Sequence, residues 1–382
     1  MKKLIRITTV PISLDKLLGS QLSYMNRFFE VRIISSDTKK LSKVAEKYGV
    51  TSFAIEMTRT ISPLKDLISV WKTYQFLKKE KPEIVHTHTP KAGIVGMFAA
   101  YLAGVPLRMH TVAGMPLMET TGWKRILLVA VEKGTYRFAN RVYPNSFGLQ
   151  KWILCHHLCS ETKLKVIGNG SSNGIDTIYF NDPQVSQETR RGLEAKWGIS
   201  NQDFVFVFVG RLVEDKGINE LIRAFRTVSK NYSSVKLILV GPFESDLDPL
   251  EKETLHEIEM NAQIIWVGYQ EDVRPFFTLG DVLVFPSYRE GFPNVVMQAG
   301  AMGLPSIVTN INGCNEIIQD EHNGLIIPPK DPTALENTME RILVSKPLFE
   351  YLKSNARETI VNRFDQKAVW EALLKEYQTL AP

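Results

Sequence analysis

One stretch of the sequence places a carboxylate and an amide on either side of a glycine-containing turn. It runs from Tyr288 to Gly303 and reads Tyr-Arg-Glu-Gly-Phe-Pro-Asn-Val-Val-Met-Gln-Ala-Gly-Ala-Met-Gly. Glu290 lies in the turn, and Gln298 lies about one turn into the helix that should follow. These groups, beside the free N–H groups of a helix start, suit an anionic and hydroxyl-rich ligand. An ordinary connection between a strand and a helix is the alternative.

A second stretch supplies positive charge. Residues Gly210 to Gly217 read Gly-Arg-Leu-Val-Glu-Asp-Lys-Gly and directly follow the apolar run 204–209. Arg211 and Lys216 therefore leave the carboxyl end of an expected strand. Two cations at such a place can bind a diphosphate.

Two more loops should meet these stretches at the same edge of a sheet. Strands are expected at 237–240 and 264–267, and Gly241 and Tyr269 lie in the loops that follow them. In a parallel α/β sheet the ligand binds outside the carboxyl ends of the strands. The second half of the chain is therefore predicted to bind a nucleotide.

In the first half of the chain, a loop after the expected strand 84–86 carries a lysine at a helix start. It reads His-Thr-His-Thr-Pro-Lys-Ala-Gly over residues 86–93. Thr89 can cap the helix, Pro90 suits its first turn, and Lys91 adds a point charge. The loop is a candidate phosphate site, and a plain capped helix with a solvated lysine is the alternative.

Two other loops of the first half are candidates. Residues 11–20 follow the first expected strand and contain Gly19 at the start of the next helix. His110 lies at the carboxyl end of the expected strand 107–111, where it should face a ligand at the edge of the sheet. A histidine with a purely structural role is the alternative.

These candidates lie between strand-like and helix-like segments that alternate along the whole chain. One helical segment, 64–79, has apolar residues at 64, 67, 68, 71, 74 and 77, close to helical spacing. The chain ends in another, 365–380, with Trp370 and Tyr377 on its apolar face. Such alternation is typical of doubly wound parallel sheets, so the predicted fold class is α/β. With 382 residues, two domains are expected, 1–180 and 181–364.

The charge of the chain is unevenly distributed. Residues 1–177 contain 26 Lys and Arg against 12 Asp and Glu, whereas residues 178–382 contain 20 against 29. This asymmetry indicates that the first half faces an anionic partner, either a phosphate-bearing substrate or a membrane surface. Segment 122–141 can lie against anionic lipid headgroups, or it can be a surface helix packed on the sheet. No motif indicates nucleic acid as a partner.

Composition favours the cytoplasm. The amino end reads as a strand rather than a signal peptide, and the longest uncharged run, 92–107, is too short and broken to span a bilayer. Three cysteines cannot form a disulfide framework, which agrees with a reducing compartment.

The order of the motifs resembles a known family. A Gly-Arg-x-x-x-x-Lys-Gly loop followed by a Glu-Gly-Phe-Pro loop, in the second of two Rossmann-like domains, resembles the retaining GT-B glycosyltransferases of family 4. The resemblance covers essentially the whole chain. It implies two domains facing across a cleft, with the nucleotide sugar held mainly by the second. It also implies a last helix, 365–382, that joins the first domain, and no required metal or other cofactor.

The resemblance also implies roles for single residues. Arg211 and Lys216 match the pair that holds the donor diphosphate. Glu290 matches the first acidic residue of a Glu-x7-Glu element near the donor sugar, and His110 matches a histidine near the same sugar. These four residues are the catalytic candidates.

Further donor contacts are implied in the stretch after Glu290. Gly291, Phe292 and Pro293, followed by Asn294, match a loop whose backbone lies against sugar and phosphate. Gln298 stands where the family usually has its second glutamate, which binds the ribose hydroxyls. The amide keeps the capacity to form hydrogen bonds but loses a charge.

A narrower resemblance concerns the acceptor. Stretches 86–93, 110–116 and 168–176 look like bacterial transferases that extend lipid-linked oligosaccharides for capsule, O-antigen or protein glycosylation. This implies that a polyprenyl-diphosphate-linked saccharide binds near Gly19, Thr89, Lys91 and His110, at the inner face of the cytoplasmic membrane.

The predicted activity is transfer of a hexosyl or N-acetylhexosaminyl group from a nucleotide sugar, with UDP favoured, to that lipid-linked acceptor. Two alternatives stay open at this point. One is a UDP-sugar epimerase of the same fold class, which would need carboxylates set for proton transfer. The other is a non-catalytic protein that binds sugar nucleotides, with Gln298 as a sign of decay.

Overall fold

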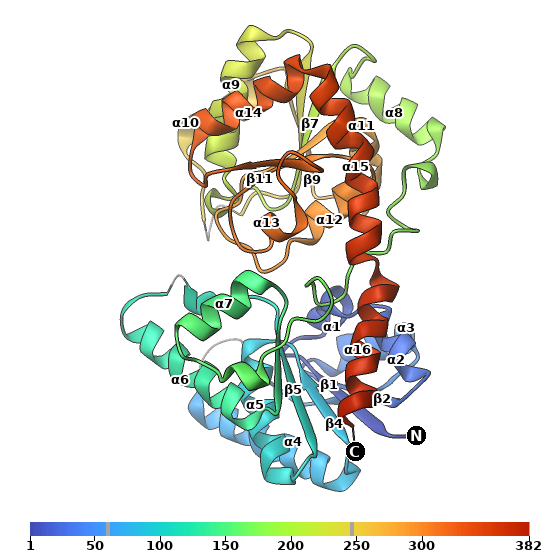
Figure 1. The fold of residues 1–382 in the computed structure, drawn as a ribbon, viewed down its shortest axis with the longest axis vertical. Helices are drawn as coiled ribbons and strands as arrows, with labels where there is room; N and C mark the ends of the chain where they lie inside the picture. The colour runs from blue at the N-terminus through green and yellow to red at the C-terminus, as the bar shows by residue number, and fades with distance from the viewer. Residues whose placement is uncertain (59–61, 119, 245–247, 382) are drawn as a thin grey trace. The chain divides into compact units, whose positions relative to one another are not determined.

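The chain folds into two compact units (Figure 1). One comprises Met1–Gly174 together with Gln366–Pro382, and the other comprises Ile175–Asp365. The sequence analysis placed this boundary at residue 180 and assigned the last helix to the first unit. The computed structural model describes residues 1–58, 62–118, 120–244 and 248–381.

The first unit is built on a parallel sheet of six strands in the order β3-β2-β1-β4-β5-β6. The strands are β1 (Lys3–Ile7), β2 (Glu30–Ser35), β3 (Thr51–Ala54), β4 (Ile84–Thr87), β5 (Leu107–Val112) and β6 (Arg141–Pro144). The helices are α1 (Pro11–Leu17), α2 (Gln21–Asn26), α3 (Thr38–Tyr48), α4 (Pro63–Glu80), α5 (Pro90–Ala103), α6 (Gly122–Phe138), α7 (Phe147–Cys155) and α16 (Gln366–Leu380).

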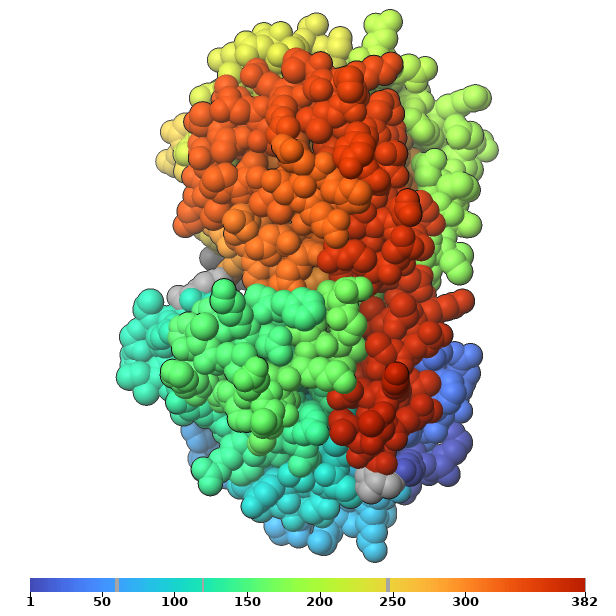
Figure 2. Space-filling model, viewed as in Figure 1, coloured from blue at the N-terminus to red at the C-terminus, as the bar shows by residue number. Residues whose placement is uncertain are grey.

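Both faces of this sheet are buried. Leu4 and Ile5, neighbours in β1, belong to two different apolar clusters, because successive side chains of a strand point to opposite faces. The carboxyl-terminal helix α16 closes one of these clusters with Trp370 and Tyr377. Figure 2 shows this helix, in red, packed against the other residues of its unit. Burial on both faces explains why the strands read as continuous apolar runs.

The second unit repeats the architecture with the strand order β12-β11-β10-β7-β8-β9. Its strands are β7 (Phe204–Val209), β8 (Val235–Val240), β9 (Ile264–Gly268), β10 (Val282–Phe285), β11 (Ser306–Thr309) and β12 (Gly324–Ile327). Its helices are α8 (Gln187–Trp197), α9 (Ile218–Asn231), α10 (Lys252–Met260), α11 (Arg274–Leu279), α12 (Asn294–Ala301), α13 (Cys314–Ile317), α14 (Pro332–Val344) and α15 (Lys346–Phe364). The fold class predicted from the sequence, α/β with two doubly wound parallel sheets, is confirmed.

The structure departs from the predicted elements at one loop of the first unit, and it adds β3, β6 and β12, where no strand was predicted. Residues 11–20, expected as a loop, contain α1, which begins at Pro11. Proline suits a first helical position because the N–H it lacks would have no partner there. The helix predicted at 64–79 is present as α4, and Leu64, Leu67, Ile68 and Trp71 in it are exposed. None of the helices in the described part of the chain is long and apolar enough to cross a bilayer.

Candidate functional site

The strand order of the second unit reverses between β7 and β10, and two predicted charged residues meet there. Lys216 ends a short turn, Glu214–Lys216, after β7, and Glu290 lies in the loop after β10. Lys216 Nζ lies 2.6 Å from Glu290 Oε1, and the two side chains are only 14% and 17% exposed. The structure therefore brings together two residues that are far apart in the sequence.

Gly217 makes this meeting possible. Its φ is +71°, and a Cβ added to it would lie 2.2 Å from the carbonyl oxygen of Pro286. The loops also pair directly, since the N–H of Tyr288 donates to the carbonyl of Asp215 at 2.9 Å. Only glycine permits both the positive φ and this close approach of the two backbones.

Side-chain hydroxyl and amide groups hold the loop that carries Glu290. Ser287 Oγ donates to Glu290 Oε1 at 3.1 Å, and Thr309 Oγ1 donates to the Ser287 carbonyl. Asn312 Nδ2 donates to the carbonyl oxygens of Glu290 at 3.2 Å and Gly291 at 2.8 Å. Sequence reasoning missed these supporting residues because a single serine, threonine or asparagine in a loop has no distinctive spacing.

The other predicted cation, Arg211, lies where the ends of β7 and β8 touch. A Cβ added to Gly241 would lie 1.8 Å from the carbonyl oxygen of Gly210, so the two loops are in backbone contact. Arg211 Nη1 lies 2.6 Å from Glu244 Oε2. This hydrogen bond raises the pKa of the Arg211 guanidinium, and the negative charge of Glu290 adds to the effect. An exposed ion pair contributes little stability, so an anionic ligand can replace Glu244.

The remaining residues of the Glu-Gly-Phe-Pro loop divide between the interior and the surface. Phe292 and Pro293 are buried, and the ring of Phe292 packs edge-on against Phe364 with centroids 5.4 Å apart. Asn294 is the exposed first residue of α12, and Gln298, one turn later, is half-buried. The buried pair anchors the loop, which leaves its backbone and Asn294 for contact with a ligand.

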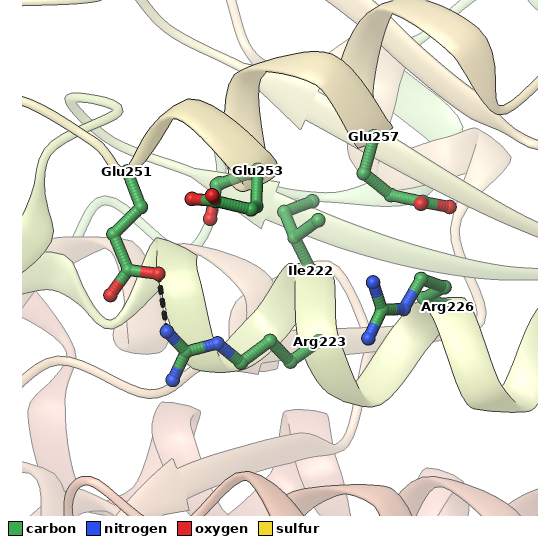
Figure 3. Close-up of a pocket in the computed structure, with 7 residues that line it drawn as sticks. Ile222, Arg223, Arg226, Glu251, Glu253 and Glu257 are labelled. Carbon is green, nitrogen blue, oxygen red and sulfur yellow. Dashed lines mark hydrogen bonds and ion pairs between the residues drawn. The ribbon is translucent and has the colours of Figure 1, made fainter.

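Two features of the second unit lie apart from these loops. Tyr269 is exposed and follows the edge strand β9, with β8 between it and β7. A hollow of about 200 Å³ between α9 and α10 contains none of the predicted residues (Figure 3). Basic side chains of α9 face acidic ones of α10 there, and Arg223 is paired with Glu251. Its charges therefore compensate one another, as on an ordinary solvated surface.

In the first unit, the predicted phosphate loop is engaged in contacts of its own. Thr89 precedes α5, but its side chain does not cap the helix. Its Oγ1 accepts a hydrogen bond from the N–H of Thr9 at 3.0 Å instead, so the capping prediction was wrong. Lys91 Nζ lies 2.5 Å from Asp66 Oδ2, with side chains 11% and 23% exposed. This ion pair ties the start of α5 to the start of α4.

His110 lies inside β5 and is fully buried, whereas we expected it to face the edge of the sheet. Its Nδ1 lies 2.7 Å from Thr87 Oγ1, and a Cβ added to Gly93 of α5 would lie 2.7 Å from its Cε1. Burial lowers the pKa of His110 to about 3. The imidazole is therefore neutral at physiological pH, and it supports the start of α5 from within the unit.

Gly19 lies between α1 and α2, and its φ is +50°. Its N–H donates to the carbonyl of Leu14 at 3.0 Å. The residue is buried, so its contribution is the turn that it allows between two short helices.

A buried arginine escaped the sequence analysis. Arg6 of β1 is fully buried and forms no ion pair within the described part of the chain. Its Nε donates to His88 Nε2 at 2.9 Å and its Nη2 to Gln21 Oε1 at 2.7 Å. Tyr377 of α16 joins the same group, with its hydroxyl 2.6 Å from His86 Nδ1. A charged residue in a strand suggests a solvated face, so only the structure could reveal this internal role.

Two Rossmann-like units, with charged loops at a reversal of strand order, define a GT-B fold. Residues 189–359 match the family described as glycosyl transferases group 1, and residues 22–170 match the glycosyl transferase 4-like domain. A Staphylococcus aureus relative, the capsular polysaccharide biosynthesis glycosyltransferase CapM, is 33% identical over 99% of this chain and 97% of its own length. The chain therefore belongs to the group 1 glycosyltransferases.

Other similar proteins agree. An Escherichia coli relative, UDP-Gal:alpha-D-GlcNAc-diphosphoundecaprenol alpha-1,3-galactosyltransferase, is 31% identical over 89% of this chain and 86% of its own. The solved structure of Anabaena Alr3699/HepE in complex with UDP superposes with a TM-score of 0.83 at 20% identity. It covers 99% of this chain and 100% of that one. This last likeness concerns the fold, and it agrees with the predicted GT-B class.

Proposed function

We propose that this glycosyltransferase transfers a hexosyl or N-acetylhexosaminyl group from a UDP-sugar to a saccharide carried on a polyprenyl diphosphate, with retention. The observation that carries the proposal is the contact of Lys216 with Glu290 at the reversal of strand order. The names of the relatives support the substrate classes, since one specifies UDP-Gal and a diphosphoundecaprenol acceptor and another capsular polysaccharide.

The reaction develops negative charge on the leaving diphosphate. Arg211 and Lys216 supply positive charge at the place where that diphosphate would bind, so they lower the barrier electrostatically without a required metal. A bound diphosphate would compete with Glu244 for Arg211 and with Glu290 for Lys216. Glu290 would keep its hydrogen bond from Ser287 and would be free to face the donor sugar.

The rest of the donor would lie along α12. Asn294 and the backbone N–H groups of Gly291 and the helix start offer donors to phosphate and sugar oxygens. Gln298 would hydrogen bond the ribose hydroxyls as a neutral partner. The acceptor diphosphate would approach the carboxyl edge of the first sheet, where Lys91 is already held by Asp66.

A screen of donors and acceptors tests the proposal. UDP-, GDP- and dTDP-sugars are incubated with a synthetic polyprenyl-diphosphate sugar, and the product's anomeric configuration is read by NMR. We expect turnover with a UDP-sugar and the same anomeric configuration in donor and product. Tight UDP binding without turnover across the panel would contradict the proposal and favour a binding protein. Release of an epimer without acceptor would favour an epimerase.

A further inference from the structure

The first two turns of α4 expose an apolar stripe. Leu64, Leu67, Ile68 and Trp71 are 79%, 61%, 55% and 58% exposed. Their spacing of three and four residues places them on one face of the helix. Ser69, Thr73 and Leu77 are the buried residues of α4 and lie on the opposite face. The stripe therefore lies on the face of α4 that points away from the rest of its unit.

This orientation is the reverse of that seen in α9. In α9, the apolar residues Ile218, Leu221, Ile222 and Phe225 have the same spacing and are fully or almost fully buried. A helix that buries polar residues and exposes large apolar ones loses hydrophobic stabilisation in water. Contiguous exposed apolar surface of this kind marks an interaction site.

Exposed lysines lie next to the stripe. Lys65 and Lys72 lie along one side of it, and Lys78 and Lys79 follow it toward the end of the helix. The whole first unit contains 28 Lys and Arg against 13 Asp and Glu, whereas the second contains 18 against 28. A partner of this face must offer an apolar region to the stripe and negative charge to the lysines. A partner with an anionic surface over an apolar interior meets both conditions.

A groove beside α4 shows the same combination. It has a volume of about 600 Å³ and lies between α4 and the edge strand β3. Phe53 and Phe76 line it with stacked rings 4.3 Å apart, and Lys72 and Lys79 also belong to its lining. The rest of the lining is mostly polar or charged, including Arg32 and Glu80, so the two rings could contact an acyl chain while the lysines contact an anionic headgroup.

We propose that the stripe, Leu64, Leu67, Ile68 and Trp71, inserts into the interface of an anionic phospholipid bilayer, with the α4 lysines on the headgroups. A second copy of this chain is a poorer occupant, since like-charged lysines would face one another. The inference deepens the proposed function and rests on it for one point, the presence of the acceptor lipid in that bilayer.

Vesicle co-sedimentation of the full chain tests this. We expect wild-type protein to bind phosphatidylglycerol-containing vesicles roughly tenfold or more tightly than pure phosphatidylcholine, and less tightly as salt is raised. The double variant Leu67→Gln/Trp71→Gln should lose roughly tenfold or more of this binding. Lys72→Gln and Lys78→Gln should each lose roughly fivefold, which separates the ionic part from the apolar part.

The matched control changes two exposed apolar residues of the acidic unit. Met260 and Val344 are 70% and 65% exposed, and Met260→Gln/Val344→Gln should bind vesicles like the wild type. A third variant, Trp123→Gln/Ile126→Gln, changes the exposed residues at the start of α6. Vesicle binding by the α4 variant at the wild-type level would overturn the proposal, whether or not the α6 variant loses binding.

Two further measurements distinguish the remaining outcomes. If the α4 variant changes only the oligomeric state, the stripe is a contact between copies and the proposal fails. Turnover on a short-chain acceptor dispersed in detergent should stay within about twofold of wild type in the α4 variant. If wild-type protein transfers no sugar to any acceptor yet binds vesicles through α4, the proposed reaction fails and the membrane inference stands.

Discussion

Each unit has a lysine that follows a strand at the reversal of strand order, and the two lysines make nearly the same contact with a carboxylate. Lys216 follows β7 and lies 2.6 Å from Glu290, and Lys91 follows β4 and lies 2.5 Å from Asp66. Each strand adjoins the reversal of strand order in its sheet, and all four side chains are largely buried. The sequence analysis assigned a phosphate to both lysines.

The two ion pairs differ in the element that carries the carboxylate. Asp66 belongs to the first turn of α4, so its ion pair joins two helices that remain packed with or without a ligand. Glu290 lies in a loop, and a second cation, Arg211, leaves the same strand end as Lys216. A buried pair between helices is suited to holding structure, whereas a pair between loops beside a second cation can open around an anion.

The largest expected effect comes from removing each lysine. Lys216→Ala should lower kcat/KM by about 10²–10³-fold, because the charge that stabilises the leaving diphosphate is lost. Lys91→Ala should keep turnover within about threefold and lower Tm, because it leaves the Asp66 carboxylate buried without its partner. Steady-state kinetics and thermal unfolding of the two variants measure both effects.

A result at either lysine could contradict the distinction between the two ion pairs. Turnover of Lys216→Ala within a few-fold of wild type would remove its diphosphate role. A raised acceptor KM in Lys91→Ala at unchanged Tm would restore the phosphate role expected from the sequence. Lys91→Met/Asp66→Leu is the control, since it removes both charges together and should recover Tm.

The second prediction concerns the glycine that lets the two loops of the second unit touch. Gly217→Ala should destabilise the protein by about 3 kcal/mol and reduce turnover, because the new methyl group would meet the Pro286 carbonyl. Gly49 is the matched control, with φ +64° and no atom within 4 Å of an added Cβ. Gly49→Ala should cost only about 1 kcal/mol, with turnover unchanged. Equal losses in the two variants, measured by urea unfolding, would contradict the loop contact.

A smaller effect is expected at the exposed pair of Arg211 and Glu244. Arg211→Ala should raise the KM for the UDP-sugar by about tenfold, because one charge-assisted contact is lost. Glu244→Gln should lower that KM by about twofold, since the carboxylate no longer competes for the guanidinium. A higher KM in Glu244→Gln would show that Glu244 positions Arg211 instead of competing with the ligand.

The last prediction is a pH dependence of the stability of the first unit. Burial holds the pKa of His110 at about 3, below its ordinary value of about 6.5, so the unfolded chain binds the extra proton first. The buried His110 therefore has no effect on the free energy of unfolding above about pH 6.5. As the pH falls from there toward 3, this free energy decreases by about 1.4 kcal/mol per pH unit. The Tm of His110→Gln should fall less than that of wild type between pH 7 and 5. An equal fall in both proteins would contradict the neutral, buried state of this histidine.

The local sequence pattern predicted the fold class correctly, but it predicted the contacts of single side chains less well. The alternating segments and paired motifs indicated two doubly wound sheets and the family, and both predictions are confirmed. The cap by Thr89 was wrong because a neighbouring strand end offers Thr9 as a partner, which no local spacing could show. The placement of His110 failed similarly, since its position in the strand did not reveal that α5 would cover it.

The sequence by itself indicated that strands and helices alternate along the chain, and that charged loops leave the carboxyl ends of the strands. These properties depend on the periodicity of apolar residues and on neighbouring residues, and both can be read from the sequence. The tertiary structure alone decided that Lys216 touches Glu290, that Arg6 is buried, and that the apolar stripe of α4 points outward. Each of these depends on contacts between distant segments, and helical spacing defines a face without defining its direction.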